Sequence, residues 1–207
     1  MPDLLDGVTW FRHSSIRIRK DGLEIHVDPW GLREKGKADY ILLTHPHYDN
    51  FSEEDIARVR SPDTVLVAPA SMRKQLADVD HLLRAGDMVQ LQGIDILAMP
   101  AHNLERKFHP ADSGWLGYVF SLGSITYYHS GHTEPLESMA GVRCDVAFIP
   151  CCSDYTMGPR EAADLASRCG ASVLVPLHWD ESPSGPEEVA SLADFFSGTV
   201  ELLPRTP

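Results

Sequence analysis

The first quarter of the chain carries short apolar stretches that are separated by polar or glycine-containing turns. Val8–Phe11, Ser15–Arg19 and Leu23–Val27 alternate apolar and polar positions or stay apolar for a few residues. Such stretches are typical of strands joined in a meander. The next stretch, Tyr40–Thr44, is apolar up to its last residue, which predicts a buried strand leading into a histidine-rich loop.

After residue 50, strand-like stretches alternate with helix signals. Ser52, followed by three acidic residues, predicts a helix to about Arg60, because Ser caps helix N-termini and acidic groups suit the first turn. Pro159 predicts another helix start, since Pro is favoured at the first helical position. We expect further strands at 64–68, 88–91, 94–99, 115–122, 125–129, 145–149, 173–177 and 200–203, and helices at 70–78, 135–140, 159–170 and 186–196. No repeat or linker divides the chain, so residues 1–207 are predicted to form a single α/β domain.

Composition narrows the class of protein. With 43% hydrophobic and 23% charged residues, the chain is typical of a globular protein and not of a disordered one. A net charge of −12 disfavours a nucleic-acid partner, because phosphate backbones would be repelled. No apolar stretch approaches the roughly 18 residues that cross a bilayer, and the start lacks the features of a signal peptide. We therefore expect a cytoplasmic protein with a small-molecule substrate and no membrane partner, and we leave a homo-oligomer open.

The cysteines of the chain suggest no functional site, whereas the histidines do. The four cysteines, at 144, 151, 152 and 169, have no C-x-x-C spacing, so we expect buried thiols and neither a zinc ribbon nor a disulfide framework. Ten histidines are many for this length. Their positions carry most of the functional prediction.

The strongest local signal is the loop that follows the strand at 40–44. His45, His47 and Asp49 stand at two-residue spacing there. Two imidazoles and a carboxylate on one tight loop can turn inward together, and they are ligand types that zinc prefers. His and Asp also satisfy backbone groups in ordinary loops, but three of them within five residues at a strand end favour a metal site.

With this loop the chain resembles the metallo-β-lactamase superfamily, whose signature is H-x-H-x-D-H. The segment 96–102, which ends in Pro-Ala-His102, is similar to the third ligand segment of that family. Segment 127–133, with His132, is similar to the one that usually ends in Gly-Asp-Thr, and 175–179, with His178, resembles the terminal ligand segment. Segments 9–13, 27–29 and 156–159 are most similar to a branch of Zn-dependent hydrolases that includes the ascorbate-6-phosphate lactonases. The resemblance implies a four-layer αββα sandwich.

The resemblance also implies a metal site. His45, His47 and His102 are expected to hold one tight metal ion, zinc first and Mn or Fe as alternatives, with an open position for water. Two departures weaken a second site, since Asn50 replaces a histidine and His132 replaces the bridging aspartate. An imidazole offers one lone pair and cannot bridge as a carboxylate does.

We therefore predict that the second site, assembled from Asp49, Asn50, His132 and His178, is weak or absent. His132 is alternatively a fourth ligand that would close the first site.

Several neighbouring residues have two interpretations. His13 belongs to the pocket wall with Asp28 beside it, or it is an ordinary buried histidine. His109 lines the mouth of the pocket, or it is a solvated loop residue. Arg106 and the lysine after it attract an anionic substrate group, or they are a solvated pair.

These features predict an enzyme. We expect a metal-dependent hydrolase in which a metal-bound hydroxide attacks a small ester, lactone or phosphoester, anionic substrates included. Asp49 is the candidate catalytic residue, because it is the only carboxylate of the ligand loop and suits the orientation or deprotonation of that water. The alternative is a metal-binding, non-hydrolytic sensor or interaction protein on the same fold, with altered second-metal ligands.

Overall fold

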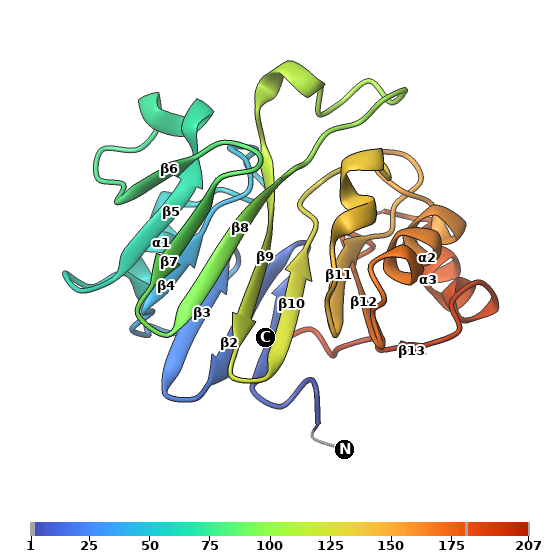
Figure 1. The fold of residues 1–207 in the computed structure, drawn as a ribbon, viewed down its shortest axis with the longest axis horizontal. Coiled ribbons are helices and arrows are strands. Elements are labelled where there is room, and N and C mark those ends of the chain that lie inside the picture. Colours follow the sequence, from blue (N-terminus) through green and yellow to red (C-terminus); the bar gives the residue numbers. More distant parts are fainter. Residues whose placement is uncertain (1–2, 181, 207) are drawn as a thin grey trace.

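Two β-sheets packed face to face form the centre of the fold (Figure 1). The computed structural model describes residues 3–180 and 182–206. In spatial order, the first sheet contains β1 (Val8–Arg12), β2 (Ser15–Lys20), β3 (Leu23–Val27), β4 (Tyr40–Leu42), β5 (Val65–Pro69) and β6 (His81–Leu83). The second contains β13 (Thr199–Val200), β12 (Val173–Leu177), β11 (Val146–Pro150), β10 (Ile125–His129), β9 (Leu116–Leu122), β8 (Ile94–Pro100) and β7 (Met88–Leu91).

Each sheet combines an antiparallel half with a parallel half. In the first sheet β1, β2 and β3 are antiparallel neighbours, and β3 to β6 are parallel. In the second, β7 to β10 are antiparallel, and β10 to β13 are parallel. Strands β1 and β4 therefore run in the same direction, as do β8, β10 and β12. The loops that follow these strands leave from one edge of their sheet.

The main apolar core lies between the sheets. Ile16 and Ile18 of β2 and Phe120 and Tyr127 of the second sheet belong to it, and all four are almost completely buried. Because side chains alternate along a strand, Arg17, which lies between these isoleucines, faces the outer side of the first sheet.

Helices cover the outer faces of the two sheets (Figure 1). Helix α1 (Glu53–Val59) packs with apolar residues of the first sheet, and α2 (Pro159–Arg168) and α3 (Gly185–Ala190) lie against the second. The expected four-layer αββα sandwich is thereby confirmed. None of the helices in the described residues is long and apolar enough to cross a membrane.

The two longer helices begin where the sequence predicts. The Ser52 side chain accepts a hydrogen bond of 3.1 Å from the Asp55 amide, which caps α1. Pro159 is the first residue of α2, and Glu161 accepts a hydrogen bond of 2.9 Å from the Gly158 amide. These caps satisfy amides that have no partner inside the helix.

The shorter helices differ from the sequence prediction. The segment 70–78 forms only the 3₁₀ helix η1 (Ala70–Lys74), and the segment 135–140 forms the 3₁₀ helix η3 (Glu137–Gly141). The predicted helix at 186–196 is divided into α3 and the 3₁₀ helix η4 (Leu192–Asp194). Met72 is the one buried side chain of η1, so this segment lacks the apolar stripe that stabilises a longer helix. A fourth 3₁₀ helix, η2 (Ala111–Ser113), and strand β6 were not predicted.

Two hydrogen bonds join the sheets near the histidine loop. The Tyr118 hydroxyl of β9 donates to the Leu43 carbonyl at 2.6 Å, and the Leu116 amide donates to the Thr44 carbonyl at 3.1 Å. Tyr118 is completely buried, so water cannot replace its hydrogen bond. The loop after β4 is thus attached to the second sheet.

We expect Tyr118→Phe to lower the free energy of unfolding by about 1–3 kcal/mol, because a buried carbonyl loses its donor. Tyr127→Phe is the matched control, since the buried hydroxyl of Tyr127 has no hydrogen-bond partner among the described residues. Urea denaturation of both variants measures the difference. Equal destabilisation by the two substitutions would contradict the role given to the Tyr118 hydrogen bond.

Candidate metal centre

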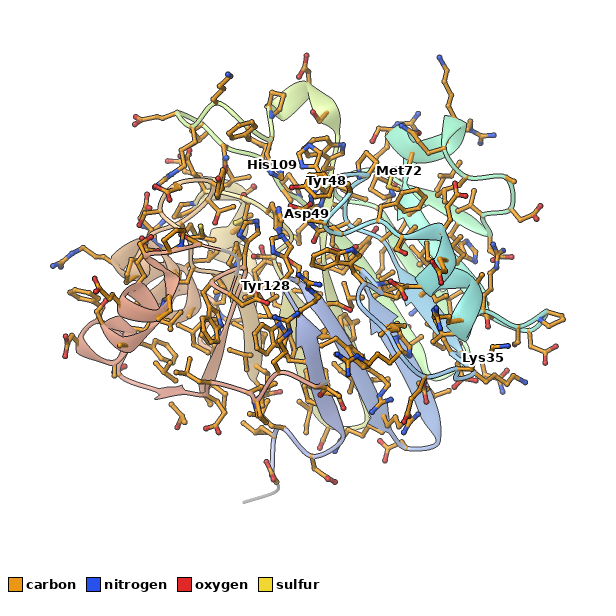
Figure 2. The ribbon with its side chains drawn as sticks, turned by 180° about the vertical axis from the view of Figure 1, so that it is seen from behind. Lys35, Tyr48, Asp49, Met72, His109 and Tyr128 are labelled. Atoms are coloured by element: carbon orange, nitrogen blue, oxygen red, sulfur yellow. The ribbon has the colours of Figure 1, made fainter. Side chains whose placement is uncertain are left out.

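Five segments bring histidines to one edge of the sandwich. His13 follows β1, His45 and His47 follow β4, and His109 lies in the long loop after β8. His132 follows β10, and His178 follows β12. The common strand directions within each sheet explain why residues so far apart in sequence meet. Figure 2 shows the labelled His109, Tyr48 and Asp49 together at this edge.

The side chains form three overlapping groups whose ligand atoms lie within 4.8 Å of one another. The groups are His45 with His47 and Asp49, His45 with His109 and His132, and His13 with His132 and His178. His45 and His132 each belong to two groups, so the three form one continuous cluster.

Three of the imidazole rings form a nearly equilateral triangle. The ring centroids of His45, His47 and His109 lie 4.9, 5.0 and 4.8 Å apart. Trp115 packs against all three rings, with centroid distances of 4.7 to 5.2 Å. One indole therefore fixes three ligand candidates at once.

Several imidazole nitrogens of the cluster are buried without a hydrogen-bond partner. They are Nε2 of His45, Nδ1 of His109, Nδ1 of His132, Nδ1 of His178 and both ring nitrogens of His13. Buried polar atoms without a partner are rare and require an explanation. A set of convergent imidazole nitrogens fits a bound metal ion, because each neutral ring offers one lone pair.

Burial keeps the rings of His45, His47, His109, His132 and His178 neutral. It lowers the pKa of His109 to about 3 and that of His178 to about 3, with neighbouring imidazoles adding to the effect. Burial also holds the pKa of His45 and His132 well below the usual value, and it lowers that of His47. At neutral pH the lone pairs are therefore free to bind a metal ion.

Hydrogen bonds orient two central rings. Nδ1 of His45 lies 2.8 Å from the Thr44 hydroxyl, which donates to Asp28 at 2.5 Å. The hydroxyl oxygen then accepts from His45 Nδ1, which leaves the lone pair on Nε2. Nε2 of His132 lies 2.8 Å from the Ser14 hydroxyl, so the free nitrogen of His132 is Nδ1.

Three of the cluster histidines have left-handed backbone conformations. The φ angles of His13, His109 and His178 are 52°, 60° and 63°. Such angles are uncommon for residues with a side chain. Backbone contacts hold two of these residues together, since the His178 amide donates to the His13 carbonyl at 3.0 Å.

The carboxylate of Asp49 is contacted by His13 and by Asn50. Nε2 of His13 is 3.4 Å from one carboxylate oxygen of Asp49, and the Asn50 amide donates to the other at 2.9 Å. Although burial opposes it, the neighbouring His13 and the hydrogen bond from Asn50 hold the pKa of Asp49 below its usual value. Asp49 is thus a carboxylate at neutral pH.

His102 does not take the place expected for it. The described ligand groups contain His109 instead. The His102 backbone is engaged by the segment after β10, because its carbonyl accepts from the Thr133 hydroxyl at 2.9 Å and from the Glu134 amide at 3.1 Å. The chain then continues for seven residues before it returns to the cluster. The sequence signal for this return is the pair His109-Pro110 shortly before Trp115.

Arg106 is occupied by protein groups and does not face the pocket. Its guanidinium binds Glu134, and it donates to Glu161 at 2.8 Å and to the Ser153 carbonyl at 3.1 Å. Glu134 in turn accepts hydrogen bonds from two amides of the same loop, at residues 104 and 105. Arg106 therefore fastens the loop that carries His109 to the start of α2.

The cluster forms the base of a pocket of about 420 Å³. Its mouth carries aromatic side chains: Tyr48 is 86% exposed, and Phe108 and Tyr155 are 45% and 43% exposed and pack against each other at 5.8 Å. Trp30, Cys152 and Ser182 complete the wall. Among the described residues that line the pocket there is no Arg or Lys.

Comparison with known proteins supports this picture. The family described as "Beta-lactamase superfamily domain" matches residues 7–178. A "UPF0173 metal-dependent hydrolase" of Pyrobaculum calidifontis is 26% identical over 221 residues, covering 96% of this chain and 93% of that protein. A similarly named protein of Methanopyrus kandleri is 26% identical over 222 residues, covering 97% of this chain and 96% of its own.

Solved structures agree on the fold. A Parabacteroides distasonis protein provisionally named a metal-dependent hydrolase superposes with a TM-score of 0.83 and 28% identity, covering 95% of this chain and 93% of that one. Igni18, a metallo hydrolase of Ignicoccus hospitalis, has a TM-score of 0.78 at 20% identity, covering 97% of this chain and 95% of its own. The sandwich, the histidine cluster at its edge and the family match over most of the chain together establish that this protein belongs to the metallo-β-lactamase superfamily.

Proposed function

We propose that the protein is a metal-dependent hydrolase of a small substrate. The observation that carries this proposal is the set of neutral, buried imidazoles with unpartnered nitrogens at the base of an open pocket. Relatives of the chain are named metal-dependent hydrolases, which supports the same function. A divalent ion bound by these nitrogens would lower the pKa of a water molecule and polarise the bond under attack.

We assign the tight metal site to His45, His47 and His109. Their rings are nearly equidistant, and burial keeps them unprotonated. Zinc is our first choice because it favours sites with three imidazoles, and Mn and Fe are the alternatives. His109 takes the role that the sequence assigned to His102.

A second, weaker site is proposed for Asp49, His13 and His178, with His132 between the two sites. His13 supplies the imidazole that Asn50 cannot, since it groups with His132 and His178. The one free nitrogen of His132 can bind only one ion, because its other nitrogen is engaged by Ser14. His132 therefore cannot bridge two ions as a carboxylate would, so the repulsion between two neighbouring dications is offset less, which favours one tight and one weak equivalent.

Asp49 is the proposed catalytic residue. It borders the pocket as an ionised carboxylate that is oriented by His13 and Asn50. Such a group can orient a water molecule or accept its proton. Tyr48, beside it at the mouth, is largely exposed and can contact the substrate.

The pocket favours an uncharged ester or lactone over a phosphoester. Its mouth is aromatic, and the cations that would neutralise a phosphate are absent from the described lining. Arg106, the nearest candidate in sequence, is engaged by two carboxylates. Lactones stay among the candidates because of the sequence segments shared with the lactonase branch.

The alternative function is metal binding without hydrolysis. His132 favours it, because its free Nδ1 lies in the same group as His45 and His109. If this nitrogen took the fourth position of the tight site, no position would be left for water. Turnover measurements separate this alternative from the hydrolase.

We expect His109→Ala to purify with far less metal than the unmodified protein and to bind it at least tenfold more weakly. Residues that only hydrogen-bond to a metal ligand contribute about 10–100-fold to metal affinity, and a direct ligand contributes no less. His102→Ala is the matched control, and it should retain its metal. Elemental analysis of protein purified without a metal-affinity tag makes the comparison. Metal loss in His102→Ala and full occupancy in His109→Ala would reverse the assignment.

Asp49→Asn keeps the shape of the side chain and removes its charge. We expect kcat for an activated ester such as 4-nitrophenyl acetate to fall on the order of 100-fold or more, the usual scale for a positioned acid or base. Metal analysis of the same preparation shows whether the tight ion is retained. An Asp49→Asn variant with full activity and full metal would remove Asp49 from the mechanism.

The same assay tests the proposed function itself. Metal-loaded protein should hydrolyse 4-nitrophenyl esters faster than 4-nitrophenyl phosphate, and a chelator should abolish the turnover. Protein that holds its metal but turns over neither esters nor lactones would favour the non-hydrolytic alternative.

A further inference from the structure

A second cavity lies on the outer face of the first sheet and shares no lining residue with the metal centre. Its volume is about 280 Å³. Figure 2 shows Lys35, one of its lining residues, far from the edge that carries Tyr48, Asp49 and His109. The part of the sheet around this cavity carries no function in the proposal above.

The floor of the cavity is a row of side chains across three strands. Thr9 pairs with Arg17, and Arg17 pairs with His26, in the registers of β1, β2 and β3. Phe11 forms an apolar wall, because the His26 ring stacks on it at 6.2 Å and the Arg17 guanidinium lies 5.5 Å above it. The floor thus combines an aromatic surface with the guanidinium of Arg17, which can donate hydrogen bonds.

Two nitrogens of this floor are buried without a partner. His26 is 1% exposed, and while its Nε2 lies 2.9 Å from Glu24, its Nδ1 has no hydrogen-bond partner. Arg17 donates through Nη2 to the Thr9 hydroxyl at 3.0 Å, but its Nε is buried and unpartnered. Because Nε2 of His26 donates to the Glu24 carboxylate, the free Nδ1 is an acceptor. The Nε–H of Arg17 is a buried donor without an acceptor, which is costly, and an anion in the cavity would satisfy it.

The charge of the rim also favours an anion. The cavity is lined by four basic side chains, Arg17, Arg19, Arg33 and Lys35, and by two acidic ones, in a protein whose net charge is −12. Arg33 and Lys35 form no hydrogen bond or ion pair with any residue that the structure describes. Of the two carboxylates, Glu24 is already engaged by Arg19 and His26. Burial and the neighbouring Arg19 lower the pKa of Arg17, which means that its charge lacks full compensation.

We propose that this cavity binds a small molecule that carries a phosphate group. The guanidinium of Arg17 presents a planar fork that suits phosphate oxygens, and the exposed Arg33 and Lys35 add positive charge at the rim. The cavity is slightly smaller than a usual ligand pocket of about 300 Å³ or more, so it accommodates a phosphate with a short organic group against Phe11. A larger nucleotide does not fit that volume.

Titration calorimetry with glycerol 3-phosphate on the metal-loaded protein tests this site. We expect one equivalent to bind at the cavity, and Arg17→Met to weaken that binding by at least tenfold. Arg33→Met, on an exposed residue that does not endanger folding, should weaken it severalfold. Lys37→Met is the matched control: it removes a charge from the same segment, but Lys37 pairs with Asp63 at 3.0 Å and does not line the cavity.

Further arms separate this site from other binding modes. Phosphate that binds at the metal centre would lose affinity in His109→Ala and not in Arg17→Met or Arg33→Met, which would overturn the proposal. Equal binding by Arg33→Met, Lys37→Met and the unmodified protein would overturn it as well. So would the absence of binding at millimolar glycerol 3-phosphate, or tighter binding of 3-hydroxybutyrate, a carboxylate of similar size.

Discussion

Burial of the two sheets against each other is the constraint on which the rest of the molecule depends. Each strand must turn one set of alternate side chains into the shared apolar layer, and a slip by one residue would expose that set to water. The registers, and with them the exit points of the loops, are therefore fixed by the core. The loops after β1, β4, β8, β10 and β12 meet because their strands cannot shift. Tyr118 adds a direct tie between the two layers beside the histidine loop.

The same constraint explains how much of the protein could be predicted from its sequence. Strand positions and the loop of His45, His47 and Asp49 follow from short-range patterns, whereas the four-layer sandwich was implied by the family resemblance that these segments carry. The pocket was one of two interpretations for His109, but its grouping with His45 and His132 could not be predicted, because it depends on how a loop closed by Glu134 and Arg106 returns to the cluster. Ion pairs between segments 28 residues apart leave no periodic signal.

The role of His13 escaped prediction for a related reason. It follows the first strand and meets His178 only because β1 and β12 belong to different sheets that face each other. The short 3₁₀ helices were also difficult to predict. Single buried residues such as Met72 anchor them, so their sequences show no helical pattern of apolar positions. Sequence patterns thus describe elements well and describe the contacts between distant loops poorly.

The ligand set has an electrostatic character of its own. Imidazoles outnumber carboxylates, since Asp49 is the one acidic residue in the three described groups. Neutral ligands leave most of the charge of a bound cation uncompensated. Such an ion is a stronger Lewis acid than one surrounded by carboxylates, and it would attract an anion from solution more strongly. The aromatic mouth limits which anions can reach it.

The left-handed conformations of His13, His109 and His178 bear on how the centre exchanges its metal. Such conformations cost about 1–2 kcal/mol each for residues with a side chain, and contacts of the scaffold hold them in place, among them the hydrogen bond from the His178 amide to the His13 carbonyl. Rings held by the scaffold in this way do not have to be ordered by the ion. A metal ion can then leave and return without unfolding of the loops.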